Sequence, residues 1–280
     1  MKVLLTTLNS KYIHSSLALR YLKNYCQKYD FNIITKEFSI NENIEDITGI
    51  IYKSEAEIVG FSCYIWNIEQ ILRICKRLKK IKPEINIILG GPEVSFNSSQ
   101  MMKKNLFIDY IIKGEGEESF KKLGILKKKY NNDKFNQKYY KDLSDIPGLV
   151  FRKNKKIKEN SRYAIISNLD ELPQIYNQES LNQLSNKIIY YETSRGCPFN
   201  CSYCLSSTND NVRYFSIKQV KKDLLFFIEN NVDLVKFVDR TFNANKKRTK
   251  DIFKFLIENN EDTTFHFEIA ADLFEDDMLQ

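Results

Sequence analysis

Residues 1–125 alternate between short β-rich runs and longer stretches whose apolar residues recur at helical spacing, such as 15–29 and 71–81. This alternation is typical of a parallel sheet with helices on both faces. The predicted strands are Lys2–Thr7, Asn32–Phe38, Ile58–Ser62, Ile85–Leu89 and Ile108–Lys113. They predict an α/β fold with a flavodoxin-like, Rossmann-type doubly wound parallel sheet, in which ligands bind at the carboxyl ends of the strands.

The loops after the predicted strands are therefore the candidate ligand sites. Gly90-Gly91-Pro92 directly follows a strand, and glycine there lets a ligand approach the backbone without a Cβ in the way. Tight strand-to-helix turns use the same residues, so a ligand role and a conformational role both stay open. Ser62 and Tyr64 lie in a neighbouring loop, and we expect them at the same edge of the sheet.

A polar segment rich in lysine and asparagine, residues 127–140, separates this region from the rest. The expected domains are 1–126, a linker 127–187 and a second domain 188–280. The linker is expected to hold a β-hairpin, with strands at 148–152 and 156–159. Later strands are expected at 188–193, 234–238 and 264–269, with a helix at 220–228.

Composition narrows the class of protein. The chain has 280 residues, enough for two domains, and no apolar run approaches the roughly 18 residues that span a bilayer. Met1–Leu8 resembles a first strand more than a signal peptide, so a cytoplasmic protein with reduced cysteines and no membrane association is expected. The net charge is +7, but clusters such as Lys127–Lys129 are interpreted as solvated surface, and no nucleic-acid partner is expected.

Three of the six cysteines, Cys197, Cys201 and Cys204, fall within eight residues of one loop. Three thiolates can hold three irons of a cubane cluster, and the fourth iron then stays open to a small molecule. A zinc site is disfavoured because the two histidines, His14 and His266, are distant in sequence and a second cysteine pair is missing. A disulfide framework is disfavoured by the reducing compartment.

The other cysteines have a simpler interpretation. Cys26 and Cys75 lie on apolar faces of predicted helices, and Cys63 follows a strand end. We expect all three to be packing residues.

The spacing Cys-x-x-x-Cys-x-aromatic-Cys resembles the signature of radical S-adenosylmethionine enzymes. The resemblance implies a partial (β/α) barrel and a four-iron four-sulfur cluster held by Cys197, Cys201 and Cys204. It also implies S-adenosylmethionine on the open iron, and a 5′-deoxyadenosyl radical formed from it. Tyr203 takes the position of the aromatic residue beside the adenine, and a packed loop tyrosine is the alternative.

Residues 235–243 and 265–269 resemble the second and third barrel strands of the cobalamin-type members. Asp239 and Glu268 would then face the cofactor at strand ends, and capping or ion-paired carboxylates are the alternative. Gly90-Gly91-Pro92-Glu93 and residues 109–117 resemble the cobalamin-binding domain that precedes such barrels. The Asp-x-His-x-x-Gly motif is missing, so cobalamin is expected without a histidine axial ligand, and His14 is interpreted as a hydrogen-bonding loop residue.

The resemblance leaves the reaction open. It implies a cobalamin-dependent radical methyltransferase acting on an unknown small molecule, with a reductant such as flavodoxin or ferredoxin. A radical cyclase or rearrangement enzyme with the same cofactors is the alternative, and a non-catalytic cobalamin- or cluster-binding fragment is a third reading. Family barrels have six βα units, whereas residues 188–280 have room for about three, so a C-terminally truncated chain with an open sheet edge is expected.

Overall fold

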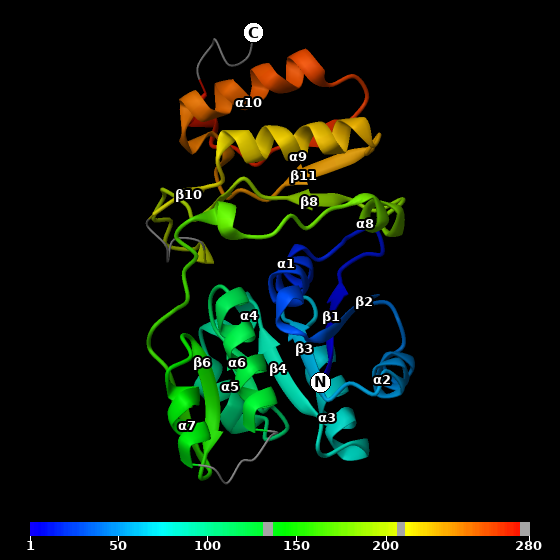
Figure 1. Cartoon of the computed structure of the whole chain (residues 1–280), viewed down its shortest axis with the longest axis vertical. Helices are drawn as coiled ribbons and strands as arrows, with labels where there is room; N and C mark the ends of the chain where they lie inside the picture. The colour runs from blue at the N-terminus through cyan, green and yellow to red at the C-terminus, as the bar shows by residue number, and fades with distance from the viewer. Residues whose placement is uncertain (131–136, 206–210, 275–280) are drawn as a thin grey trace. The chain divides into compact units, whose positions relative to one another are not determined.

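The computed structural model describes residues 1–130, 137–205 and 211–274. The chain divides into two compact units, drawn in Figure 1. Unit 1 consists of Met1–Tyr12 and Ala18–Ile166, and unit 2 consists of Ile13–Leu17 and Ser167–Gln280. Each unit is built around a sheet whose strands are mainly parallel.

Unit 1 contains a seven-stranded sheet in the order β2-β1-β3-β4-β5-β6-β7. The strands are β1 (Lys2–Asn9), β2 (Asn32–Ser39), β3 (Ile58–Ser62), β4 (Asn86–Gly90), β5 (Tyr110–Ile112), β6 (Leu149–Lys153) and β7 (Lys156–Glu159). The first five are parallel in the order 2-1-3-4-5, which is the flavodoxin-like order. The predicted doubly wound sheet is confirmed, and its five strands overlap the predicted runs.

Helices pack on both faces of this sheet because the strand residues alternate in direction. Leu4 faces the core that includes Ile47 and Ile71, whereas Val3 and Leu5 face the core on the other side. The helices and single turns of unit 1 are α1 (Leu17–Cys26), η1 (Gln27–Tyr29), α2 (Ile44–Lys53), α3 (Ile68–Ile81), α4 (Pro92–Ser95), α5 (Ser98–Lys104), α6 (Glu117–Tyr130) and α7 (Gln137–Ser144).

The hairpin expected in a linker is instead part of the first sheet. Strands β6 and β7 pair around Asn154-Lys155, as predicted, but β6 also pairs antiparallel with β5. Val150 contributes to one core of the sheet, and Leu149 and Phe151 contribute to the other. Unit 1 therefore extends to Ile166.

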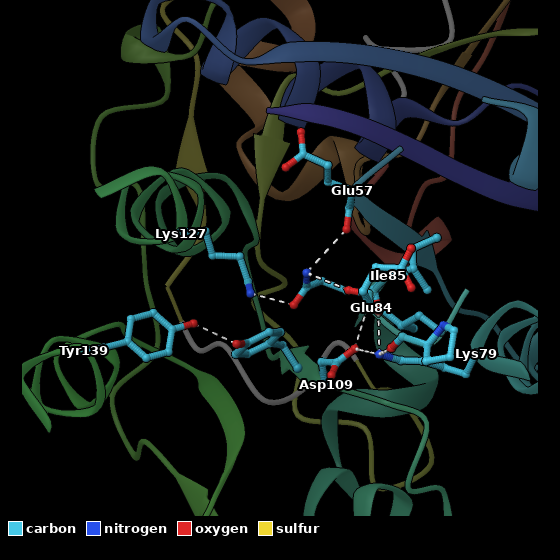
Figure 2. A network of polar contacts seen from close by, with 11 residues as sticks. Glu57, Lys79, Glu84, Ile85, Asp109, Lys127 and Tyr139 are labelled. Carbon is cyan, nitrogen blue, oxygen red and sulfur yellow. Dashed lines mark hydrogen bonds and ion pairs between the residues drawn. The ribbon is translucent and has the colours of Figure 1, made fainter. Parts of the chain in front are cut away.

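One lysine of the cluster that was interpreted as solvated surface is buried. Lys127 is 1% exposed, and its Nζ atom donates a hydrogen bond to the Oδ1 atom of Asn86 at 2.7 Å (Figure 2). The same Nζ lies 4.6 Å from the centre of the Tyr110 ring, whose hydroxyl is 2.8 Å from the hydroxyl of Tyr139. The interpretation of Lys127 was wrong because this residue falls on the buried face of α6, at helical spacing from Leu123.

Unit 2 contains a three-stranded parallel sheet in the order β12-β11-β8 and a two-stranded sheet of β9 and β10. The strands are β8 (Ile189–Tyr191), β9 (Ser194–Arg195), β10 (Arg213–Tyr214), β11 (Leu234–Phe237) and β12 (Thr264–His266). The helices and turns are η2 (Leu169–Glu171), α8 (Gln178–Gln183), α9 (Ile217–Glu229), η4 (Phe242–Ala244), α10 (Lys246–Asn259) and η5 (Ala271–Leu273). The βα alternation fits the predicted partial barrel.

Aromatic side chains form much of the core of unit 2. Phe227 of α9 contacts Tyr191 of β8 edge to face, with ring centres 5.4 Å apart. Phe237 of β11 lies 5.5 Å from Tyr191 and 4.5 Å from Phe267. Phe253 of α10 lies 5.3 Å from Phe267, so aromatic contacts pack both α9 and α10 against this core.

A short N-terminal segment, Ile13–Leu17, belongs to unit 2. The carbonyl of Ile13 accepts from the Ile188 amide at 2.8 Å, and the Ser15 hydroxyl donates to the Ile188 carbonyl at 2.9 Å. His14 Nδ1 lies 2.6 Å from the Tyr190 hydroxyl, which confirms His14 as a hydrogen-bonding loop residue. Among the described residues, none of the helices is both long and apolar enough to span a membrane.

Candidate functional site

The carboxyl ends of β1 and β3 form the point where the strand order of unit 1 reverses. In sheets of this kind, ligands bind in the crevice outside this point. Asn67, which is fully buried, connects the two strand ends: its amide nitrogen donates to the carbonyls of Leu8 at 3.0 Å and Ser62 at 3.2 Å. Its Oδ1 accepts from the backbone nitrogen of Tyr64 at 2.8 Å. Asn67 therefore fixes the loop that begins after Ser62.

The two glycines after β4 have different roles. Gly91 has a φ of +102°, and a Cβ there would lie 2.5 Å from the carbonyl oxygen of Cys63. A Cβ on Gly90 would meet the Ile112 carbonyl at 3.6 Å, which is ordinary contact. Gly91 is thus required by the fold itself, whereas the backbone at Gly90 leaves room for a side chain. Pro92 begins α4 directly after the Gly91 turn.

Large apolar side chains are exposed in the loops at this edge. Tyr64 and Trp66 stack with ring centres 4.5 Å apart and planes 4° from parallel, and Trp66 is 47% exposed. Ile65 between them is 79% exposed, and Tyr12 after β1 is 71% exposed. An apolar surface around a few polar backbone groups is what a large, partly apolar ligand requires.

The loop after β5, by contrast, contacts the β6–β7 hairpin and the segment that follows it. The Lys113 ammonium pairs with the Glu159 carboxylate and lies 5.0 Å from the centre of the Tyr163 ring. Glu115 accepts a hydrogen bond from the Ile166 amide at 3.0 Å. Hydrogen bonds from Lys113 and Ser99 lower the pKa of the Glu159 carboxyl below its ordinary value.

The cysteine loop begins directly after β9 and is shaped by Gly196. This glycine has a φ of +105°, and a Cβ there would lie 2.5 Å from the Asn211 carbonyl oxygen. Cys197 is buried, Cys201 is half-buried, and Cys204 is exposed. The amide of Cys204 donates to the carbonyl of Cys201 at 3.1 Å, which closes a turn. Tyr203, in the same turn, is 90% exposed.

The three thiols do not converge on one point in this structure. Across residues 1–130, 137–205 and 211–274, no group of three or more His, Cys, Asp or Glu side chains is gathered closely enough to hold a metal ion. The donor set nevertheless suits an iron–sulfur cluster in number and chemistry, because three thiols share one loop and two of them reach solvent.

Asp239 holds the backbone that leads into this loop. Its carboxylate is 1% exposed and accepts from the Thr193 amide at 3.0 Å, the Thr193 hydroxyl at 2.7 Å and the Ser194 hydroxyl at 2.5 Å. Burial raises its pKa above the ordinary range, although these hydrogen bonds act in the opposite direction. Asp239 is thus directed at the Thr193 amide and at the hydroxyls of Thr193 and Ser194.

Glu268 is placed differently. Its Oε1 atom lies 3.7 Å from the Nζ atom of Lys236 on the neighbouring strand, and its side chain is 45% exposed. The structure therefore brings Asp239 to the start of the cysteine loop and pairs Glu268 with a lysine. Ser62, Gly90 and Gly91 share the carboxyl edge of unit 1, where Ser62 pairs in register with Gly90.

Three residues of these sites were missed from the sequence: Asn67, Thr241 and Arg248. Asn67 directly precedes α3 after a strand, which is a signal that could have found it. Thr241 follows Asp239 by two residues beyond β11, so it lies at the same strand end. Arg248 is buried and donates to the Thr193 carbonyl at 3.3 Å, and its helical position gave no indication of that contact.

Comparisons with known proteins match both regions of the chain. The B12 binding domain family matches residues 3–124, and the Radical SAM superfamily matches residues 191–280. The uncharacterized methyltransferase PH0819 of Pyrococcus horikoshii is 30% identical over 244 residues, covering 84% of this chain and 51% of that protein.

Two further relatives differ in the reaction that their names give. The cobalamin-dependent radical SAM methyltransferase TokK of Streptomyces tokunonensis is 24% identical over 201 residues, covering 67% of this chain and 28% of that protein. The anaerobic magnesium-protoporphyrin IX monomethyl ester cyclase of Synechocystis sp. is 27% identical over 138 residues, covering 48% of this chain and 26% of that protein.

Solved structures show the same fold. The methyltransferase TsrM from Kitasatospora setae, with cobalamin and a [4Fe-4S] cluster bound, superposes with a TM-score of 0.70 at 13% identity, over 92% of this chain and 51% of that one. The cobalamin-dependent S-adenosylmethionine radical enzyme OxsB superposes with a TM-score of 0.77 at 20% identity, over 99% of this chain and 40% of that one.

The chain spans about half the length of the Pyrococcus protein and smaller shares of the other relatives. The families that match the chain are named for two cofactors, B12 for residues 3–124 and S-adenosylmethionine for residues 191–280. The chain carries a B12 binding domain followed by a radical SAM domain, and it belongs to the cobalamin-binding radical SAM proteins.

Proposed function

We propose that this chain provides the cobalamin site and the iron–sulfur site of a radical S-adenosylmethionine enzyme that transfers a methyl group to an unactivated carbon. The observation that carries the proposal is the position of Cys197 in the segment that leaves the carboxyl end of β8, after β9 and after the backbone that Asp239 fixes. Parallel barrel sites are built at this end of the strands.

The cluster would be held by the thiolates of Cys197, Cys201 and Cys204. When bound, the cluster with S-adenosylmethionine supplies radical chemistry, and cobalamin supplies the methyl group. Cys197 would provide a buried ligand, and Cys201 and Cys204 would provide two more exposed ones. Tyr203 follows Cys201 by two residues, and we assign it to the adenine side of the bound S-adenosylmethionine.

Cobalamin would lie at the carboxyl edge of unit 1, against Ser62, Tyr64, Trp66 and Gly90. The exposed aromatic and aliphatic side chains of this edge suit a large, partly apolar ligand. The sequence has no Asp-x-His-x-x-Gly motif, which supports cobalamin without a histidine axial ligand.

A radical cyclase is the second candidate because one of the relatives above is named as a cyclase. Both candidates use the same cofactors, so the reaction product separates them: a methylated product supports the first and a new ring supports the second. We further propose a small-molecule substrate, a reductant of the flavodoxin or ferredoxin type, and a cytoplasmic location where the thiols stay reduced.

The cluster is tested by anaerobic reconstitution of the whole chain. We expect about four irons per chain with brown absorbance, loss of both in Cys201→Ala, and no loss in the control Cys26→Ala, which removes a buried thiol outside the loop. Unchanged iron in Cys201→Ala would contradict the assignment, and so would stoichiometric zinc in protein purified without oxygen.

The cobalamin site is tested by titration, with quenching of the fluorescence of Trp66, the one tryptophan of the chain, as the signal. Tyr64→Ala is expected to weaken binding at least tenfold because it removes the ring stacked on Trp66. Tyr52→Ala, which removes an exposed tyrosine of α2, is the matched control. Equal affinity of the two variants would remove the β3 loop from the proposed site.

A further inference from the structure

Thr241 is the residue beside the cysteine loop for which the proposed function gives no role. Its hydroxyl oxygen lies 3.5 Å from the sulfur of Cys197, and both residues are buried, at 6% and 9% exposure. We propose that Thr241 donates a hydrogen bond to the Cys197 sulfur and thereby raises the reduction potential of the cluster. This inference rests on the proposed cluster at Cys197, Cys201 and Cys204.

The direction of the hydrogen bond follows from the chemistry of a ligating cysteine. Either atom can donate while Cys197 is a thiol. A cysteine that binds iron is a thiolate, which has no proton and can only accept. The Thr241 hydroxyl is then the donor, in a buried place where a hydrogen bond to a charged acceptor is stronger than in water.

Both partners are held in place by separate parts of unit 2. The backbone before Cys197 is fixed by Asp239 through Thr193 and Ser194. The turn that follows Thr241 is fixed from the segment after β12: the Phe242 amide donates to the Glu268 carbonyl at 2.9 Å, and the Asn243 side chain exchanges hydrogen bonds of 2.8 and 2.9 Å with the Ala270 backbone.

Buried charge adds to this rigidity. The Arg248 guanidinium donates to the Thr193 carbonyl and lies 5.1 Å from the centre of the Tyr214 ring. Asp239 after β11, Arg248 of α10 and Tyr214 of β10 thus converge on Thr193 and Ser194. The Thr241–Cys197 contact is therefore a fixed contact between two supported backbones.

The expected effect on the cluster follows from its charge. One-electron reduction adds one negative charge to the cluster, and this charge is shared by the ligating sulfurs. A donor to one sulfur stabilises the reduced state more than the oxidised state, so hydrogen bonds to the sulfurs raise the potential. Loss of the donor should therefore make the cluster harder to reduce.

The test is a redox titration of the anaerobically reconstituted whole chain, with dithionite as the electron donor and electron paramagnetic resonance as the readout. Thr241→Val keeps the side-chain shape and removes the hydroxyl. We expect a roughly tenfold lower ratio of reduced to oxidised cluster at a fixed potential, which corresponds to a midpoint lower by about 59 mV for a one-electron couple. Thr241→Ser should titrate like the wild type because it keeps the donor.

Thr48→Val is the matched control, because it removes a buried threonine hydroxyl from α2 in unit 1 and should leave the midpoint unchanged. If Thr241→Val holds less iron, the midpoint is measured on Thr241→Ala. Equal midpoints in iron-loaded wild type and Thr241→Val overturn the inference alone. Loss of the cluster in both hydroxyl-free variants, with retention in Thr241→Ser, assigns the hydroxyl to holding the loop and also overturns it. Wild type that binds no iron overturns the proposed function as well.

Discussion

The ammonium group of Lys127 lies 2.7 Å from the side-chain oxygen of Asn86, and both residues are buried in unit 1. The Asn86 amide nitrogen reaches the carbonyls of Glu57 and Glu84 at 3.4 Å each, so this side chain joins the starts of neighbouring strands to helix α6 (Figure 2). Removing one partner of a buried hydrogen bond leaves the other unsatisfied, which lowers the free energy of unfolding.

Lys127→Met should lower the free energy of unfolding by about 2 kcal/mol, because it leaves the Asn86 oxygen buried without this donor and removes the cation from the Tyr110 ring. Urea unfolding of the whole chain measures the change. Lys128→Met is the control, since Lys128 pairs with the exposed Asp30 on the surface, and little change is expected. Equal losses in the two variants would contradict a buried role for Lys127.

Gly91→Ala should destabilise unit 1 by at least about 2 kcal/mol even without any ligand, because a Cβ would collide with the Cys63 backbone at a positive φ. Gly90→Ala should change the unfolding free energy by no more than about 1 kcal/mol. Cobalamin affinity is therefore best tested at Gly90. A Gly91→Ala protein as stable as the wild type in urea would show that the turn can shift.

The ionised Glu159 carboxylate makes the stability of unit 1 depend on pH at the acidic end of the range. The Lys113 hydrogen bond lowers the pKa of the Glu159 carboxyl in the folded chain, so its contribution to stability is present above the ordinary carboxyl pKa of 4.5 and is lost as pH falls through the lower, folded value. Wild type should exceed Glu159→Gln in urea midpoint at neutral pH, and the two should converge below about pH 4. Parallel curves from pH 7 to pH 3 would exclude this linkage.

Alkylation should separate five of the six cysteines into two groups. Cys26, Cys63 and Cys75 are fully buried, and burial raises the pKa of the Cys26 thiol to about 12, so native protein should leave them unmodified. Cys201 and Cys204 should react with iodoacetamide in the apo chain, as identified by peptide mass spectrometry. Reconstitution with iron should protect both. Continued labelling of Cys201 in iron-loaded protein would argue against it as a ligand.

The sequence predicted the parallel sheet well because its signals are local. Val59 and Phe61 in β3, or Ile87 and Leu89 in β4, lie in short apolar runs whose type does not depend on distant residues. The pairing of β6 with β5 was not predictable in this way. Both strands were predicted from the sequence. Their antiparallel pairing depends on the tertiary fold, and the sequence of residues 149–153 does not specify the partner strand.

The site residues also divide into those that a local pattern predicts and those whose role depends on distant contacts. The cysteine spacing is a local pattern and pointed to the loop directly. The role of Asp239 depends on a contact with residues 46 positions earlier, and that of Thr241 on a contact 44 positions away, so the sequence could name Asp239 as a candidate without saying what it touches. The sequence also could not distinguish Gly90 from Gly91, because only the structure shows that Gly91 has a positive φ and faces the Cys63 backbone.

The assignment of Ile13–Leu17 to unit 2 sets an order of events during synthesis. His14 and Tyr190 are 176 residues apart, so at roughly 5–20 residues per second the partner leaves the ribosome about 10 to 35 s after the segment does. Strand β1 can pair with β2 and β3 long before then. The segment that follows β1 can pair with β8 only after that strand has been made, and this pairing closes one of the longest loops among the described residues.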